Sequence, residues 1–295
     1  MASSTRTPRV DKLYDSLSRY QWWQRWLRRA RSGTGLEMHK RLLDASIGDL
    51  PGAGRAELNR WLWTLVADRF ETAPRVLDIG CGFGATLLAW AGRDDATRAG
   101  TFVGLTLSGY QTQRATGEAK RLGLHGACTF KTQSFDDAVD GSAERLFDVV
   151  VSVETLFHAP DLLRTLSGLA ATVRPGGAIV LVEDMAVDVG VKEETAARTL
   201  RDRWATTDLR TIDEYRGALS DAGFDLERDI DLTAQVDLPA RASRDRRERR
   251  LHRLRRFTPV GRRVIDAFLG GIAMERLYSA GLLSYRAMVA TRRHL

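Results

Sequence analysis

An acidic residue followed by closely spaced glycines offers the clearest chemistry in this sequence of 295 residues. The apolar run Val76–Ile79 carries Asp78, and Gly80–Gly84 follows with glycine at every second position. Glycine lets the backbone approach a ligand closely, and the first turn of a helix offers free N–H groups to an anion. The segment therefore predicts a ligand site where a buried strand passes into a helix.

Two kinds of ligand, and a plain tight turn, are compatible with this segment. A strand, a glycine turn and a helix can hold the pyrophosphate of a dinucleotide. The spacing here is GxGxG rather than GxGxxG, however, and the carboxylate of Asp78 would repel a pyrophosphate. A carboxylate suits a ligand that carries an ammonium or sulfonium group, because opposite charges attract strongly at short range. The sequence favours the cationic ligand.

Glu154 and His158 are the candidate catalytic residues. They follow a predicted strand at its carboxyl end, where open α/β sheets place their ligands, and a spacing of four predicts one face of a helical turn. Glu154 could stabilise a cation or accept a proton, and His158 could act as a general base near neutral pH. In the alternative interpretation His158 packs beneath the following helix, which Asp161 caps.

Short apolar runs alternate with helical stretches from residue 75 onward. This alternation implies crossover connections and an α/β fold with a parallel, doubly wound sheet. Strands are expected over residues 75–78, 101–105, 127–131, 147–152, 178–182, 224–233 and 283–291. Helices are expected over residues 84–92, 109–122, 136–144, 159–173, 211–222 and 260–280.

The first quarter of the chain has a different character. Helices are expected over residues 10–30 and 57–70, with another around His39, and five of the seven tryptophans precede residue 64. The early tryptophans, with arginines between them, could form an amphipathic helix on an anionic membrane surface. They could equally belong to a lid that closes a pocket and excludes water.

Four segments together resemble class I S-adenosylmethionine-dependent methyltransferases. Asp78–Gly84 resembles their first motif, and Val103–Gln111 is similar to the second-strand segment of cyclopropane-fatty-acid synthases and related lipid methyltransferases. Ser152–Asp161 resembles the fourth-strand region of sterol C-methyltransferases, and Val173–Gly177 is similar to the turn before the fifth strand across the class. The resemblance covers roughly residues 70–185 and is nearest to the sterol C-methyltransferase and cyclopropane-synthase branch.

This resemblance implies S-adenosyl-L-methionine as the cofactor, with the acid and the glycines at its methionine end. Most class I enzymes bind the ribose with an acid at the end of the second strand, where this chain has Thr106. Ribose contacts would then fall to Thr106, Leu107 and Gln111, although Thr106 could simply cap the next helix. Phe135 could lie on the adenine or belong to the core. The expected cofactor residues are Asp78, Gly80, Gly82, Thr106, Leu107, Gln111, Ser134 and Phe135.

The resemblance also implies a division of the chain. We expect an N-terminal helical lid over residues 1–70 and a Rossmann-like cofactor-binding core over 71–235. An Arg-rich helical insertion over 236–281 then precedes the final strand of the core at 282–295. The whole is a doubly wound, mostly parallel, seven-stranded sheet with helical additions.

The implied activity is methylation of a small apolar acceptor of sterol, terpenoid or lipid type, most simply at carbon, in lipid or secondary metabolism. Glu154 and His158 would serve the acceptor. O- or N-methylation of a small aromatic or amine metabolite stays open, as do RNA methylation and an NAD-dependent oxidation at the glycine turn. The two cysteines show no metal-type spacing, so no metal is expected.

The net charge of +7 is unevenly distributed. Residues 1–35 carry +6 and residues 241–263 carry +9, so the remaining chain carries −8. An acidic core with two basic segments does not favour nucleic acid as a partner, whereas Arg241–Arg263 could contact an anionic group or a membrane surface. A solvated helix face is the simpler alternative. We expect a cytoplasmic, at most membrane-peripheral, protein, with the oligomeric state open between monomer and homodimer.

Overall fold

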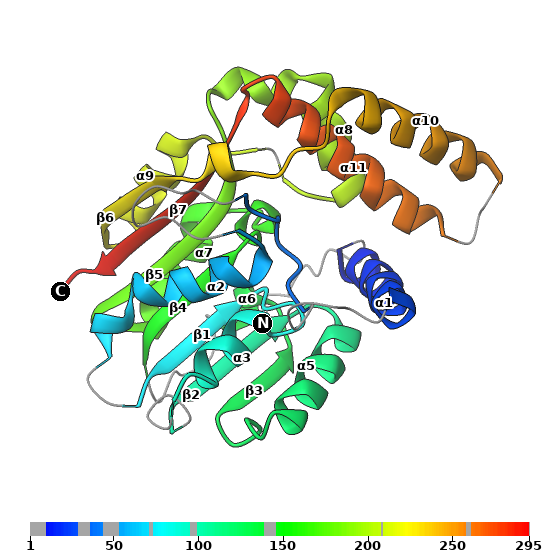
Figure 1. The fold of residues 1–295 in the computed structure, drawn as a ribbon. Helices are drawn as coiled ribbons and strands as arrows, with labels where there is room; N and C mark the ends of the chain where they lie inside the picture. Colours follow the sequence, from blue (N-terminus) through cyan, green and yellow to red (C-terminus); the bar gives the residue numbers. More distant parts are fainter. Residues whose placement is uncertain are drawn as a thin grey trace.

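A single mixed sheet with strand order β3-β2-β1-β4-β5-β7-β6 organises the computed structural model (Figure 1). The structure describes residues 10–28, 36–43, 53–70, 73–94, 99–138, 146–207, 209–257 and 261–294. Its strands are β1 (Arg75–Ile79), β2 (Thr101–Thr106), β3 (Cys128–Thr132), β4 (Phe147–Val153), β5 (Val173–Ala186), β6 (Phe224–Asp231) and β7 (Leu283–Arg292). Only β7 runs antiparallel to its neighbours, β5 and β6, among these strands. The predicted doubly wound sheet of seven strands is confirmed.

Helices cover both faces of this sheet. They are α1 (Val10–Arg28), α2 (Arg55–Thr64), α3 (Ala85–Ala91), α5 (Gly109–Arg121), α6 (Phe135–Ala138), α7 (Leu162–Thr172), α8 (Thr195–Trp204), α9 (Ile212–Asp221), α10 (Arg241–Phe257) and α11 (Arg262–Ser279). The α2 and α3 side chains pack on one face, and those of α7 and α9 on the other. A central strand must therefore be apolar on both sides. In β4, Val149 and Val151 join one core cluster and Val150 joins the other, all fully buried.

The strand order places a crevice between β1 and β4. The chain leaves β1 toward β2 on one side, and β4 lies on the other side of β1. The connecting segments diverge at such a switch point, which leaves room for a ligand beyond the carboxyl ends of the strands. Asp78 near the end of β1 pairs in register with Val151 of β4 and Gly104 of β2. The acidic residue singled out in the sequence therefore lies at this crevice.

The helix predicted around His39 is wrong. Residues 36–43 adopt an irregular conformation apart from a single bridge between Leu42 and Val236. Their backbone groups bond to distant partners: Lys40 N donates to a Glu154 carboxylate oxygen at 2.9 Å, and Leu43 N donates to Gln235 O at 2.7 Å. Tertiary hydrogen bonds have replaced the local ones that a helix would need.

A helical layer lies beyond the carboxyl ends of the parallel strands. Figure 1 shows α8, α10 and α11 there, with α11 packed against α1, α8 and α10. Helix α8 has no counterpart among the sequence predictions, and residues 241–257 of the Arg-rich stretch form helix α10. Trp204 at the end of α8 donates its Nε1 hydrogen to Ala267 O of α11 at 2.7 Å. The predicted boundaries between four domains stay predictions.

Replacing Gly270 by alanine should destabilise this layer. A Cβ atom at Gly270 would lie 2.3 Å from Trp204 Cδ1, which is impossible without movement, whereas one at Gly271 would lie 3.9 Å from Trp204 Cζ2. We expect Gly270→Ala to lower the free energy of unfolding by about 1–3 kcal/mol in urea titrations. Gly271→Ala, which gains the same helix propensity of about 1 kcal/mol, is the matched control. Equal effects of both substitutions would contradict the packing described here.

Candidate active site

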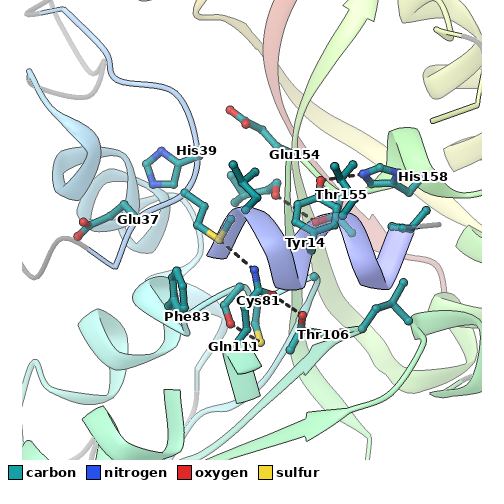
Figure 2. A pocket seen from close by; sticks show the side chains of 18 of the residues that line it. Tyr14, Glu37, His39, Cys81, Phe83, Thr106, Gln111, Glu154, Thr155 and His158 are labelled. Atoms are coloured by element: carbon teal, nitrogen blue, oxygen red, sulfur yellow. Dashed lines mark hydrogen bonds between the residues drawn. The ribbon is translucent and has the colours of Figure 1, made fainter. Parts of the chain in front are cut away.

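One cavity of about 310 Å³ collects most of the residues that the sequence singled out. It lies against the carboxyl ends of β1, β2 and β4 and is closed by α1, residues 36–39 and α11. In Figure 2, Cys81, Phe83, Thr106 and Gln111 lie toward one end, and Glu154, Thr155 and His158 lie toward the other. The lining includes Asp78, Gly80, Gly82, Thr106, Leu107, Gln111, Phe135, Glu154 and His158.

The Asp78 carboxylate is buried without a partner. Only 3% of the residue is exposed, and no group in the described ranges forms a hydrogen bond or ion pair with it. Burial therefore raises its pKa well above the usual value, because water no longer stabilises the charged form. A buried acid without a partner is costly unless a ligand supplies the missing cation. This acid fits the ammonium group of S-adenosylmethionine.

Packing within the protein restricts the residue types allowed in the glycine turn. Gly80 has a φ of +72°, and a Cβ atom there would lie 2.1 Å from Thr155 Oγ1. Gly82 also has positive φ, at +54°, and a Cβ atom there would face Met38 Sδ at 3.3 Å. Glycine at position 80 is thus required by the neighbouring loop after β4, independently of any ligand.

Thr106 and Gln111 form a hydrogen-bonded unit that also holds α1. Thr106 Oγ1 donates to Gln111 Oε1 at 2.5 Å, and Gln111 Nε2 donates to Ser18 Oγ of α1 at 2.9 Å. The interpretation of Thr106 as a helix cap is wrong, since the Ser108 side chain caps α5 by accepting from Gln111 N. The lining positions of Thr106 and Gln111 therefore depend on contact with the N-terminal helix.

Ser134 lies outside the cavity lining, unlike its neighbours Gln133 and Phe135. The Ser134 hydroxyl accepts a hydrogen bond from Asp136 N at 3.2 Å at the start of α6, and its contact with the cofactor stays a prediction. Gln133 was not anticipated. Phe135 is buried at 8% exposure and belongs to the core cluster of α7 while also lining the cavity.

Glu154 occupies a strained position at the end of β4. Its φ of +51° is left-handed, which is uncommon for a residue other than glycine and often marks a functional site. Glu154 Oε1 accepts from Lys40 N at 2.9 Å and from Tyr285 OH at 2.9 Å, and it lies 3.2 Å from Lys40 Nζ. Glu154 Oε2 has no hydrogen-bond donor in the described part of the chain. One carboxylate oxygen is thus fixed and the other is available.

Lys40 is central to the charges behind the cavity, and sequence reasoning missed it. Its Nζ donates to Asp184 Oδ2 at 2.6 Å and lies 4.8 Å from the centre of the Tyr285 ring. Burial raises the pKa of Glu154, but Lys40 outweighs that effect and the net shift is downward, so Glu154 is ionised. The sequence did contain a signal, because Lys40 is one of only five lysines beside forty arginines. Lysine supplies a compact point charge, which suits a single ammonium group placed between two carboxylates.

His158 is neutral and bonded to the N-terminal helix. Its Nε2 lies 2.8 Å from the hydroxyl of Tyr14 on α1, and burial lowers its pKa to about 4. The expected helical turn shared with Glu154 is not formed, because Glu154 is left-handed and the short 3-10 turn begins at Leu156. Both side chains still line the cavity. The cap expected from Asp161 is confirmed, since its side chain accepts from Arg164 N at 3.0 Å.

His39 presents a nitrogen without a partner. Its Nδ1 lies 3.0 Å from Lys40 O, and because a carbonyl can only accept, Nδ1 must carry the hydrogen. Nε2 then holds a lone pair, and no group in the described ranges bonds to it. Burial lowers the pKa of His39, which keeps the ring neutral. Figure 2 shows His39 on the side of the cavity near Glu37.

Aromatic side chains form part of the cavity wall. Phe157 and Trp204 have ring centroids 6.1 Å apart, and Phe268 of α11 and Tyr14 of α1 complete this wall. Trp22, Trp23 and Trp26 were also expected to shape the pocket, but their side chains lie outside the described residues. This part of the lining is thus rich in aromatic side chains, and its charged members include Glu154 and the ion-paired Arg247 and Glu275.

Residues 53–228, well over half of the chain, match a family model described as a methyltransferase domain. The chain belongs to this family. The match confirms the resemblance to class I S-adenosylmethionine-dependent methyltransferases, and with it the enzymatic nature of the protein and S-adenosylmethionine as the cofactor. The arrangement of a buried acid, a glycine turn and a cavity at the switch point agrees with that family.

Similar proteins of known activity span several acceptors. The methyltransferase is 29% identical over 201 residues to 24-methylenesterol C-methyltransferase 2 of Oryza sativa subsp. japonica, covering 64% of this chain and 52% of that one. It is 29% identical over 155 residues to 27-O-demethylrifamycin SV methyltransferase of Amycolatopsis mediterranei, covering 52% and 54%. The chain spans about half the length of the curated relatives it matches.

Solved structures extend the likeness in fold to almost the whole chain. A geranyl diphosphate methyltransferase in complex with geranyl diphosphate and sinefungin has a TM-score of 0.65 at 16% identity, over 97% of this chain and 99% of that one. The [4+2]-cyclase SpnF has a TM-score of 0.66 at 19% identity, over 96% of both chains. No helix in the described ranges is long and apolar enough to span a membrane.

Glu183 supports the turn that carries the candidate catalytic residues. Its Oε1 accepts from Thr155 N at 2.9 Å, from Leu156 N at 2.8 Å and from Ser152 Oγ at 3.1 Å. Burial raises the pKa of Glu183 to about 8 despite these donors. The folded protein therefore holds a proton at Glu183 that an unfolded chain loses near the ordinary pKa of 4.5.

We predict that Glu183 makes the protein less stable as pH rises between about 4.5 and 8. The folded state binds more protons in this window, so the free energy of unfolding falls with rising pH. Glu183→Gln removes this dependence. Between pH 5 and pH 8 the stability of the variant relative to the wild type should rise by more than about 1.4 kcal/mol, the value of one pKa unit. Parallel pH profiles in denaturant titrations would contradict the assignment.

Proposed function

We propose that this methyltransferase transfers the methyl group of S-adenosylmethionine to a carbon atom of a small apolar acceptor. The observation that carries the proposal is the polarity of the cavity. A buried acid without a partner in the described ranges lies at the glycine turn, and the lining also holds aromatic side chains, the ionised Glu154 and the ion pair of Arg247 with Glu275. Such a cavity suits a charged cofactor beside an apolar acceptor.

The residues that line the cofactor end support the binding of the family's methyl donor. When bound, S-adenosylmethionine supplies an electrophilic methyl group on a sulfonium. The carboxylate of Asp78 would attract its ammonium group, and the apolar side chains of Leu107 and Phe135 would hold its adenine. Thr106 and Gln111 would supply polar atoms to the ribose from positions that α1 fixes.

The acceptor end is built to tolerate positive charge and to exclude water. If the acceptor is an alkene, its π electrons would form the new bond to the methyl carbon while the methyl–sulfur bond breaks and its electron pair stays on sulfur, which releases S-adenosylhomocysteine. The neighbouring carbon of the acceptor would then be electron-poor. The aromatic faces of Phe157, Trp204 and Phe268 would stabilise that charge, as would the carboxylate of Glu154. Tyr14 and His158 stay neutral beside them.

Glu154 is the proposed proton acceptor. A proton leaves the carbon next to the electron-poor centre, and the electron pair of that C–H bond restores a double bond. Glu154 Oε2 can take this proton because Lys40 and Tyr285 occupy only Oε1. The free Nε2 of His39 is the second candidate acceptor. If one of these two residues is the general base, replacing it should lower turnover at least tenfold.

Carbon methylation also has support among the similar proteins. The sterol relatives and the geranyl diphosphate enzyme from Streptomyces coelicolor are named as C-methyltransferases. O-methylation is the second candidate, because the rifamycin relative and a Pyrenophora dematioidea enzyme match over similar lengths. The carboxylate in an aromatic chamber favours carbon, since an oxygen acceptor needs no stabilised cation.

Replacing Asp78 by asparagine should change cofactor binding and stability in opposite directions. The substitution removes the attraction for a cationic ligand, so calorimetric affinity for S-adenosylhomocysteine, which keeps the ammonium group, should fall roughly 10- to 100-fold. It also removes a buried acid without a partner, so the unliganded variant should melt at the same temperature or higher. Loss of affinity together with earlier melting would instead indicate a structural role.

Carbon methylation is tested with methyl-labelled cofactor and mixtures of sterol, terpenoid and phenolic acceptors. Mass spectrometry should find the label on carbon. Glu154→Gln should then lower turnover at least tenfold, while affinity for S-adenosylhomocysteine stays near that of the wild type. His39→Asn serves as the comparison, because it keeps a neutral polar group. A larger loss in His39→Asn would move the proton acceptor to His39, and a label found only on oxygen would refute carbon methylation.

A further inference from the structure

Helix α10 has two faces with different partners. Nine of its seventeen residues are arginines. The inner face is paired with α11: Arg247 bonds to Glu275 at 2.6 Å, Arg255 bonds to Asp266 at 2.7 Å, and Arg244 donates to Ser279 Oγ at 2.6 Å. These contacts fix the orientation of the helix about its axis.

The outer face of α10 carries arginines without partners. They recur three or four residues apart and so form one stripe along the helix. The arginine stripe consists of Arg246, Arg249, Arg250, Arg253 and Arg256. Each is exposed, and none forms an ion pair or hydrogen bond within the described part of the chain. Leu254 lies beside the stripe with 43% of its surface exposed.

Helix α10, which carries the stripe, also contributes to the lining of the active-site cavity. Arg247 of α10 and Phe268 of α11 both line that cavity, and both are exposed to solvent. Phe268 is 37% exposed, which is high for a phenylalanine. The cavity therefore reaches the surface on the side of the α10–α11 pair, which Figure 1 shows at the outer edge of the molecule.

We propose that the arginine stripe docks the enzyme on an anionic lipid surface, with the cavity mouth facing the membrane that holds the acceptor. This proposal rests on the apolar acceptor proposed above. An acceptor of that kind partitions into lipid. A cavity opening placed against the membrane surface would shorten the path of the acceptor from the bilayer to the active site. Each arginine near an anionic bilayer contributes about 1 kcal/mol of attraction, and five on one straight face can act together.

Lipid fits the stripe better than the other anionic partners. Single-stranded nucleic acid is bound by basic grooves with aromatic platforms for the bases, and the stripe is a convex helix face with no aromatic residue among its members. An acidic protein would need a complementary surface of fixed shape, whereas a row of arginines along one helix, beside an exposed leucine, suits a planar, fluid surface.

The test uses sedimentation with vesicles of phosphatidylcholine alone or mixed with phosphatidylglycerol. The wild type should bind only the mixed vesicles, and binding should weaken as salt increases. The triple variant Arg249→Glu, Arg250→Glu and Arg253→Glu should bind at least tenfold more weakly. Because this measurement needs neither cofactor nor acceptor, its result is independent of the proposed methylation.

The matched control changes net charge equally on other faces. Lys131, Arg164 and Arg228 are exposed on β3, α7 and β6, and their side chains form no ion pair within the described ranges. Their triple replacement by glutamate should leave vesicle binding within twofold, and both triple variants should keep wild-type melting and S-adenosylhomocysteine affinity. Equal loss in the two variants, no binding by the wild type, or tighter binding to RNA or to an acidic protein than to mixed vesicles would each overturn the proposal.

Discussion

The ammonium group of Lys40, held between Glu154 and Asp184, joins the parts of the site that the sheet alone does not bring together. It connects an irregular N-terminal segment to the ends of β4 and β5, and Tyr285 of β7 adds a hydrogen bond to the same Glu154 oxygen. Removal of one member would leave an uncompensated buried charge, so the cluster resists rearrangement. The wall that contains His39 is therefore fixed by electrostatics rather than by secondary structure.

The titratable groups around the cavity occupy contrasting states. Burial keeps His158 neutral and favours the protonated form of Glu183, whereas Lys40 keeps Glu154 ionised. The charge of Glu154 is balanced by Lys40, while its second oxygen has no donor in the described part of the chain. That oxygen would stabilise an electron-poor centre close to it. The protonation states of these side chains thus depend on their burial as well as on the neighbouring charges.

The sheet, the glycine turn and the Asp161 cap could be predicted because they depend on local patterns. The valine-rich sequence of β4 predicts a buried strand, and Asp161 precedes a helix in the usual capping position. The conformation near His39 could not be predicted, because its backbone hydrogen bonds go to distant residues. The same holds for Glu154, whose left-handed backbone no spacing rule signals. The predicted helical turn shared by Glu154 and His158 was wrong, although both residues line the cavity.

The buried acid at the end of β1 has a thermodynamic consequence. A carboxyl group with a raised pKa holds its proton for part of the time when the cavity contains no cation. An incoming ammonium group favours the ionised form, so occupation would expel that proton into the solvent. Association would then depend on acidity in the medium, and its measured enthalpy would vary with the ionisation enthalpy of the buffer. A single desolvated side chain would thus make the affinity for the methyl donor depend on pH.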